Sequence, residues 1–539
     1  MQNRIWRFVC IACILVIFGA FFSGCNNTDV GNNGEVSLAA PGGADTEQLE
    51  LAASPLSETD LAETDLAETE ELPPYNPNPI TYEAEDAALS GSARIESSLA
   101  GFTGSGYVTG FENNNDSLEF TINIEEAGFF DLNFITSSGN HGYKENIIAI
   151  NGSNVGKVNV LSETFTDSML KRIYFEKGQS KIKFIKEWGW VYLDSLIVVE
   201  SEPLNPNVFN ISAKLVNPNA SDNAKRVMSY LTDIYGNNIL TGQYADLGLY
   251  SHEFYAIEQE TGEKPAILGL DLMEYTPSRV LHGSDGKAAE RAIEFWEAGG
   301  IVTMCWHWNA PEDYLSGIWY RGFYTEETNI RLNKIMNGQD KNGYDLLLRD
   351  IDAIAEPLKE LQDAGVPILW RPLHEASGGW FWWGASGAEP YIELWKLIYD
   401  RLTNYHSLNN LIWLWNGQDA EWYPGDEFVD IIGEDIYAGE RVYSPQTGKF
   451  MEILEYSGGN KMVVMSENGT LFDPDLAIRD NAMWGFFATW NGDFVLVGQG
   501  LNRYSEKFTE REMLKKVYAH EKFLSLEDIP DLKTYEIKP

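Results

Sequence analysis

The first half of the chain contains short runs in which apolar and polar residues alternate with a period of two. Turn residues separate these runs at intervals of roughly ten residues. The clearest runs are Ser117–Ile124, Phe129–Phe134, Ile147–Ile150 and Lys181–Ile185. Such alternation is typical of strands that bury one face, and the regular spacing predicts an all-β sandwich of jelly-roll type over residues 79–200.

A different pattern begins at residue 205, where short apolar runs alternate with segments of helical periodicity. The helical segments include Lys287–Ala298, Tyr344–Ala364 and Tyr391–Tyr405. The apolar runs are Ile239–Gln243, Ala266–Asp271, Ile301–Trp308, Pro367–Glu375, Leu411–Asn416, Ile431–Tyr437, Met462–Glu467 and Trp484–Trp490. Eight strand–helix units predict a (β/α)₈ TIM barrel over residues 205–539.

The N-terminus has the pattern of an export signal. Two arginines precede an apolar run, Phe8–Ser23, which is about the length of a signal-peptide core and short for a membrane-spanning helix. The sequence Phe22-Ser-Gly-Cys25 resembles a bacterial lipobox, although Leu is usual where Phe22 stands. The resemblance implies a lipoprotein signal peptide over residues 1–24, lipidation of Cys25 and a cell-surface location outside a bacterium. A freely secreted protein and an uncleaved anchor remain as alternatives.

Residues 25–78 have the composition of an unfolded tether. Ser57–Leu72 is an acidic near-repeat without aromatic residues, and it leads into Pro73-Pro74. Such a segment buries too little apolar surface to offset its ordering entropy, so we expect a disordered acidic linker.

The composition of the chain excludes some classes of function and favours others. The 539 residues include 81 Asp and Glu against 39 Lys and Arg, a formal net charge of −42. So acidic a surface repels phosphate backbones, and we expect no nucleic-acid partner. With 4 Cys and 7 His, a metal cluster or a disulfide framework is not indicated. Of the 17 Trp, fourteen lie between Trp296 and Trp490, a density that favours platforms for sugar rings beside core residues.

Polar residues follow the predicted barrel strands, at the face where barrel enzymes carry their active sites. Glu375 ends the fourth predicted strand, and Glu467 ends the seventh. Two glutamates that meet across the barrel axis suit glycoside hydrolysis, in which one carboxyl protonates the leaving oxygen and one carboxylate attacks the anomeric carbon. For either glutamate alone, a helix N-cap or a rim ion pair is the alternative interpretation. The peptide after His374 has no second His at the spacing of a zinc protease.

These peptides carry a resemblance to a known family. Arg371-Pro-Leu-His-Glu375, the following Gly-Trp-Phe-Trp-Trp-Gly, Cys305-Trp-His-Trp308 and Asp435-Ile-Tyr437 resemble glycoside hydrolase family 26, over nearly all of residues 205–520. The resemblance implies a retaining endo-β-1,4-mannanase that needs no cofactor for catalysis, with Glu375 as acid/base and Glu467 as nucleophile.

The same resemblance implies roles for residues around the two glutamates. His374 would bond near the nucleophile or the sugar 2-hydroxyl, and Tyr437 would orient Glu467. Further substrate-binding positions implied by the resemblance are His307, Trp308, Trp380, Trp383 and Trp490.

The β module resembles carbohydrate-binding modules of family 35. The resemblance rests on Thr81-Tyr-Glu-Ala-Glu-Asp86 and Trp188-Gly-Trp-Val-Tyr-Leu-Asp194, with two glycine-containing turns between them. It implies a structural Ca²⁺ held by Glu83, Glu85 and Asp194, whose oxygen ligands suit that ion. Solvated strand carboxylates are the alternative. Trp188 is the expected sugar platform, with Asn140 and Tyr143 beside it, although a core position for Trp188 is also compatible with the sequence.

Three interpretations remain at this point. The chain is expected to be a monomeric, surface-tethered mannanase acting on mannan, glucomannan or galactomannan, attached to the membrane only through Cys25. Alternatively, the same chemistry acts on mixed-linkage β-glucan or β-1,3-xylan, as in some relatives. A non-catalytic glycan-binding lipoprotein is the third interpretation, and the intact glutamate pair argues against it.

Overall fold

The computed structural model describes residues 77–539 except 143, 161, 499–502 and 539. The predicted signal peptide, Cys25 and nearly all of the predicted linker lie outside these residues. Eleven strands form the N-terminal module: β1 (Ile80–Glu83), β2 (Ala88–Ser90), β3 (Arg94–Glu96), β4 (Tyr107–Thr109), β5 (Ser117–Ile124), β6 (Gly128–Ser137), β7 (Lys144–Ile150), β8 (Ser153–Val160), β9 (Thr166–Phe175), β10 (Gly178–Lys186) and β11 (Tyr192–Glu200).

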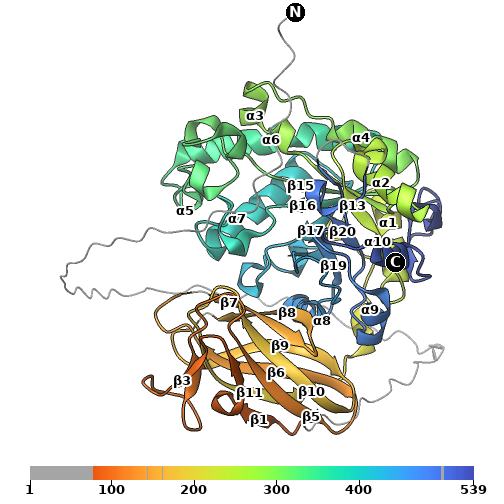
Figure 1. Cartoon of the computed structure of the whole chain (residues 1–539). Coiled ribbons are helices and arrows are strands. Elements are labelled where there is room, and N and C mark those ends of the chain that lie inside the picture. Colours follow the sequence, from red (N-terminus) through yellow and green to blue (C-terminus); the bar gives the residue numbers. More distant parts are fainter. Residues whose placement is uncertain (1–76, 143, 161, 499–502, 539) are drawn as a thin grey trace, which may run out of the picture. The chain divides into compact units, whose positions relative to one another are not determined.

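The N-terminal strands form two antiparallel sheets, drawn in red to yellow in Figure 1. One sheet has the order β3-β4-β11-β6-β9, with β1 paired to β11, and the other has the order β2-β5-β10-β7-β8. Side chains of β5 alternate between buried and more exposed positions towards its end, as a strand with one face on a core requires. Aliphatic and aromatic residues of both sheets form one hydrophobic core, so the module is the predicted β sandwich.

The C-terminal part is a closed barrel of eight parallel strands, in the order β13 to β20. They are β13 (Gly242–Tyr244), β14 (Ile267–Asp271), β15 (Ile301–Trp306), β16 (Ile368–Pro372), β17 (Leu411–Trp415), β18 (Ile431–Ile436), β19 (Met462–Asn468) and β20 (Phe487–Thr489). Outside the barrel, β12 (Ile239–Leu240) pairs with β21 (Phe523–Leu524). The sandwich followed by a barrel confirms the predicted fold class.

Helices lie around the barrel strands in Figure 1. They are α1 (Asp222–Ile234), α2 (His252–Thr261), α3 (Pro277–Leu281), α4 (Ala288–Glu297), α5 (Leu332–Met336), α6 (Lys341–Asp363), α7 (Ala388–Tyr399), α8 (Thr447–Leu454), α9 (Pro474–Asp480) and α10 (Arg511–Tyr518). The long helix α6 begins where the Asp340 side chain accepts a hydrogen bond from the Gly343 N–H, and it buries one aliphatic face. In the described part of the chain, no helix combines the length and the apolar character needed to cross a bilayer.

One predicted strand end is wrong in a way that matters for the site. The strand β16 stops at Pro372, three residues before Glu375. Leu373 and Glu375 both have φ of 53°, in the left-handed region that non-glycine residues seldom occupy. Glu375 therefore lies on a turn beyond the strand, and its backbone N–H is held by the Asn416 carbonyl at 2.8 Å. Strain of this kind persists where surrounding contacts enforce it, commonly at functional sites.

Candidate active site

Glu467 lies within β19, near its carboxyl end, and two side chains donate hydrogen bonds to its carboxylate. The Tyr437 hydroxyl donates to Oε2 at 2.8 Å, and the Arg371 guanidinium donates to Oε1. Both donors favour the ionised carboxylate and fix its orientation. The structure thus places Tyr437 where the family resemblance implied, beside Glu467.

Arg371 was not among the predicted site residues, although it lies at the centre of the site. Its side chain is fully buried in the barrel and is shared between Glu467 and Asp435, with a distance of 2.7 Å from Nη1 to the Asp435 carboxylate. Asp435 is fixed in turn by Asn416, whose amide donates to Asp435 Oδ1 at 2.9 Å. The sequence offered one signal for Arg371, namely a charged residue inside a predicted strand that is largely apolar.

Glu375 accepts fewer hydrogen bonds at its carboxyl group than Glu467 does. The Trp380 indole donates a hydrogen bond of 2.8 Å to Glu375 Oε2. Gly378 permits this contact, because a Cβ there would lie 1.9 Å from the Trp380 ring. Burial and the nearby Asp435 charge raise the pKa of Glu375 to about 8. A raised pKa suits a general acid, which must carry a proton near neutral pH.

The two glutamates meet at the carboxyl-terminal face of the barrel. Three carboxylate oxygens, one from each of Glu375, Asp435 and Glu467, lie within 4.8 Å of one another. Burial also raises the pKa of Glu467 to about 8, and the Arg371 charge opposes the rise at both glutamates. Arg371 and Tyr437 donate hydrogen bonds to the Glu467 carboxylate, whereas Glu375 accepts the Trp380 indole N–H, so a proton shared by the two glutamates is held by Glu375 and the negative charge by Glu467. This division is what an acid and a nucleophile need.

Histidine and aromatic residues surround the carboxylates. His307 follows β15, and the buried His374 directly precedes Glu375; the Nε2 atoms of the two histidines are 3.1 Å apart. The Trp490 ring lies 6.0 Å from the His307 ring and 4.7 Å from the Tyr244 ring. Trp380 is 46% exposed and adjoins Glu375, so its ring has a face open to a sugar.

Two predicted substrate-binding residues are core residues instead. Trp308 is fully buried, stacks on Trp306 with a centroid distance of 4.2 Å, and donates to Asp350 at 3.0 Å. Trp383 is also fully buried, and its indole donates to the His374 carbonyl at 2.9 Å. Neither ring offers a surface to a substrate, so Trp383 holds the Glu375 turn and Trp308 packs behind the site.

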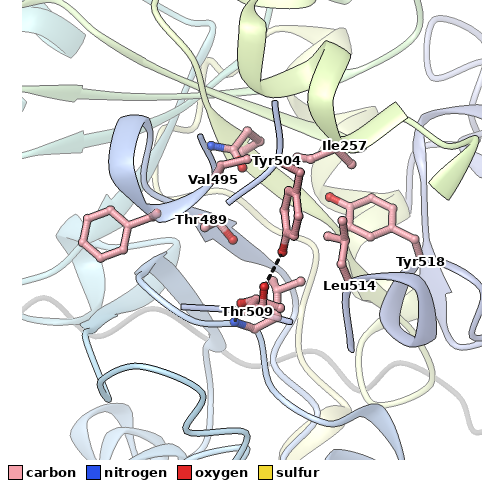
Figure 2. Close-up of a pocket in the computed structure, with 10 residues that line it drawn as sticks. Ile257, Thr489, Val495, Tyr504, Thr509, Leu514 and Tyr518 are labelled. Atoms are coloured by element: carbon pink, nitrogen blue, oxygen red, sulfur yellow. Dashed lines mark hydrogen bonds between the residues drawn. The ribbon is translucent and has the colours of Figure 1, made fainter. Parts of the chain in front are cut away.

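The cavity in Figure 2 is not the reaction site. It is a small space of about 10 Å³ between the C-terminal segment and the barrel, where the Tyr504 hydroxyl donates to the Thr509 carbonyl at 3.0 Å. Its lining includes Gln243 but neither Glu375 nor Glu467.

Comparison with known proteins identifies the family. The sequence model of glycosyl hydrolase family 26 matches residues 216–524, and that of carbohydrate binding module family 35 matches residues 80–201. The chain belongs to glycosyl hydrolase family 26. It is therefore a glycoside hydrolase of a retaining family, and catalysis in this family needs no cofactor.

Several relatives share both domains. A mannan endo-1,4-beta-mannosidase of Thermothelomyces thermophilus is 40% identical over 453 residues, which are 83% of this chain and 90% of that protein. Mannan endo-1,4-beta-mannosidase B of Piromyces sp is 34% identical over 85% of this chain and 79% of that protein. The crystal structure of the Podospora anserina GH26-CBM35 beta-(1,4)-mannanase, 39% identical, matches with a TM-score of 0.58 over 85% of this chain and 99% of that chain.

The family 35 module has two exposed indoles on one loop. Trp188 is 47% exposed and Trp190 is 58% exposed; Trp190 was not predicted as a platform. Trp190 has φ of 56°, unusual for a bulky residue, and its ring lies 5.3 Å from the His141 ring. Asn140 is exposed on the adjoining loop, whereas Tyr143 lies outside the described residues.

The predicted calcium ligands gather at one end of the module. Glu83 ends β1, Glu85 lies in the following turn and Asp194 lies in β11. The Thr103 hydroxyl is 2.9 Å from the Glu83 carboxylate and 3.0 Å from that of Asp194. Glu85 accepts the Ser105 N–H through Oε1, but Oε2 is buried and has no hydrogen-bond partner among the described residues. A cation with hard oxygen ligands would satisfy that atom.

Proposed function

We propose that this protein is an endo-β-1,4-mannanase that hydrolyses mannan-type polysaccharides by double displacement. The observation that carries the proposal is the close approach of the Glu375 and Glu467 carboxylates, within 4.8 Å, at the mouth of the barrel. Retaining glycosidases hold their two carboxyl groups about 5–5.5 Å apart, whereas inverting enzymes leave a wider gap for water.

The environment of each glutamate assigns its step. Glu467, ionised beside Arg371 and Tyr437, attacks the anomeric carbon. Glu375 gives its proton to the departing glycosidic oxygen, and a covalent glycosyl-enzyme forms. Glu375, now ionised, removes a proton from water, and that water breaks the glycosyl–Glu467 bond with a second inversion at the anomeric carbon.

The substrate class is tested by comparing polysaccharides. The names of the relatives support mannan, because both proteins compared by sequence are called mannan endo-1,4-beta-mannosidases. Reducing-sugar release by the purified chain should be greatest on glucomannan and galactomannan, and defined manno-oligosaccharides should be cut internally. Faster release from lichenan or β-1,3-xylan would replace the mannanase assignment with one of the alternatives. Product profiling of the same digests separates endo from exo action.

We propose that the module binds the same polysaccharide through the Trp190 ring, together with Trp188. A flat indole face packs against the C–H face of a sugar, and the loop holds Trp190 outward at an unusual φ. Replacing Trp190 by Ala should weaken retention on insoluble mannan by about tenfold, equivalent to about 1.4 kcal/mol. The kcat on soluble manno-oligosaccharides should not change.

Pull-down on insoluble mannan measures this effect. Ile95→Ala is the matched control, because Ile95 is an exposed apolar residue elsewhere on the module. Equal retention of the Trp190→Ala and Ile95→Ala variants would remove the binding role from Trp190.

We propose that Glu83, Glu85 and Asp194 hold a structural Ca²⁺ that stabilises the module and takes no part in catalysis. At a calcium concentration 100 times the Kd, a single site stabilises the fold by about 2.7 kcal/mol. Calorimetry of the full chain should therefore show a module transition that moves to higher temperature when calcium replaces a chelator. The Glu85→Gln variant should lose this shift and keep its mannanase activity. A shift of the same size in the variant would exclude this site.

We also propose that the protein is tethered to the outer face of a bacterial membrane through a lipid on Cys25. The support is the lipobox-like sequence alone, which lies outside the described residues. Growth with a labelled fatty acid should label the native chain, and Cys25→Ala should abolish the label and release the enzyme. Labelling of the variant would contradict this attachment.

A further inference from the structure

The barrel contains a largely buried chain of polar groups that the double-displacement mechanism does not use. It begins at Asp271, the last residue of β14, passes through His307 and reaches His374, the residue before Glu375. Asp271 Oδ2 lies 2.7 Å from His307 Nδ1. The other oxygen, Oδ1, accepts the backbone N–H groups of His307 at 3.1 Å and Met273 at 2.8 Å. Both carboxylate oxygens of Asp271 are thus engaged in hydrogen bonds.

The two histidines constrain one another. Because their Nε2 atoms are 3.1 Å apart, one Nε2 must carry a proton and the other a lone pair. The ionised Asp271 keeps a proton on His307 Nδ1. Burial and the Arg371 charge hold the pKa of His374 well below its usual range, so His374 is neutral and carries a single proton.

The remaining nitrogen decides where that single proton sits. His374 Nδ1 is buried and has no hydrogen-bond partner among the described residues. A buried N–H donor without an acceptor is costlier and rarer than an acceptor without a donor. The proton of His374 therefore sits on Nε2 and points to the lone pair of His307. The direction of the chain follows: Asp271 accepts from His307, and His307 accepts from His374.

We propose that Asp271 is a positioning residue for catalysis, which fixes the tautomers of His307 and His374 and thereby anchors the turn that carries Glu375. That turn needs an anchor, because Leu373 and Glu375 both occupy the left-handed region. The Trp383 indole holds the backbone carbonyl of His374, and the histidine chain holds its ring. Glu375 is thus tied, through His374, to β14 and β15 on the neighbouring side of the barrel.

The variant Asp271→Asn tests this role with almost no change of shape. The two backbone N–H groups at Oδ1 require an acceptor there, so the new NH₂ group must face His307 Nδ1. His307 would then carry its proton on Nε2, and His374 would be forced to put its own proton on the buried Nδ1. The substitution should therefore reverse the chain, and loss of the correct tautomer is known to be costly in catalysis.

The expected kinetic result is a decrease in kcat of about 10- to 100-fold, with KM on manno-oligosaccharides within about threefold of the native value. Asp350→Asn is the matched control, because Asp350 is a buried carboxylate that also accepts a side-chain N–H, from the Trp308 indole. A decrease in kcat shared by the two variants would assign the effect to general loss of a buried carboxylate and overturn the proposal.

Nitrogen NMR of the histidine rings gives a readout that does not depend on substrate, and it separates this inference from the proposed mannanase activity. In the native chain, His307 should be protonated on Nδ1 and His374 on Nε2, and the His374 ring should stay neutral because burial and the Arg371 charge hold its pKa well below the usual range. The charged and titratable groups that face or influence the pair are Asp271, Cys305, Arg371 and Glu467.

In Asp271→Asn both tautomers should be exchanged. A proton on His374 Nδ1 in the native chain would overturn the proposal even where the variant fails to fold. Unchanged tautomers in a folded variant would do the same.

Discussion

Replacing Glu467 by Ala is expected to lower the kcat for mannan hydrolysis by about 10⁴- to 10⁶-fold, the range seen when a covalent nucleophile is removed. The fold should survive, because Arg371 keeps its ion pair with Asp435 at 2.7 Å. The space left by the side chain admits a small anion. With azide and an activated aryl β-mannobioside, the variant should therefore form the α-mannosyl azide, since attack occurs opposite the leaving group.

The control for this experiment is Glu434→Gln. Glu434 is a buried glutamate on the neighbouring strand β18, burial raises its pKa to about 8, and its carboxylate pairs with Lys449. Its kcat should stay within a few-fold of the native value. Activity of Glu467→Ala within that same few-fold range, or a β-configured azide product, would show that Glu467 is not the nucleophile.

The two glutamates could be predicted from the sequence because each one ends an apolar run that predicts a barrel strand. Apolar residues before Glu467 fill the barrel, and a carboxylate there has no packing role. Arg371 also lies in a predicted strand, but it was not predicted as a site residue, because a charge inside a strand does not by itself indicate a partner for Glu467. In a closed barrel, a side chain from β16 can reach β19 across the interior, and only the three-dimensional arrangement reveals that contact.

Other details depend on conformation that residue types do not encode. Leu373 and Glu375 carry no sign of a left-handed backbone, so the strand was expected to continue to Glu375. Indole density predicted sugar platforms but did not distinguish Trp380, which is exposed, from Trp308 and Trp383, which are buried. That distinction depends on which side of a loop faces solvent. On the module, the sequence predicted Trp188 as a sugar platform but not Trp190, two residues further along, although both side chains are exposed.

Replacing Glu375 by Ala is expected to separate the two halves of the reaction. Mannan has a poor leaving group that needs a proton, so kcat/KM on mannan should fall by about 10²- to 10⁴-fold. An aryl β-mannobioside with an acidic phenol needs little protonation, and the glycosyl-enzyme should form rapidly. Its hydrolysis still needs a base, so stopped-flow measurements should show a burst of phenol followed by a slow steady state.

The pH dependence gives a second measurement on the native enzyme. Activity requires Glu375 to be protonated in the free enzyme, and burial raises its pKa to about 8. The proton is therefore present below that value and is lost above it, so kcat/KM on mannan should decrease on the alkaline side with a midpoint near pH 8. This alkaline limb should disappear when the Glu375→Ala variant acts on the activated aryl substrate.

Azide distinguishes the acid/base from the nucleophile in one product analysis. In Glu375→Ala, azide attacks the glycosyl-enzyme formed on Glu467, which has the α configuration, and the product should be the β-mannosyl azide. Trp380→Phe is the matched control, because it removes the indole N–H that bonds to Glu375 and keeps the carboxyl group. That variant should hydrolyse without azide and show no burst. Formation of the α azide by Glu375→Ala would show that Glu375 is the nucleophile and not the acid/base. Full activity of Glu375→Ala on mannan would show that Glu375 has neither role.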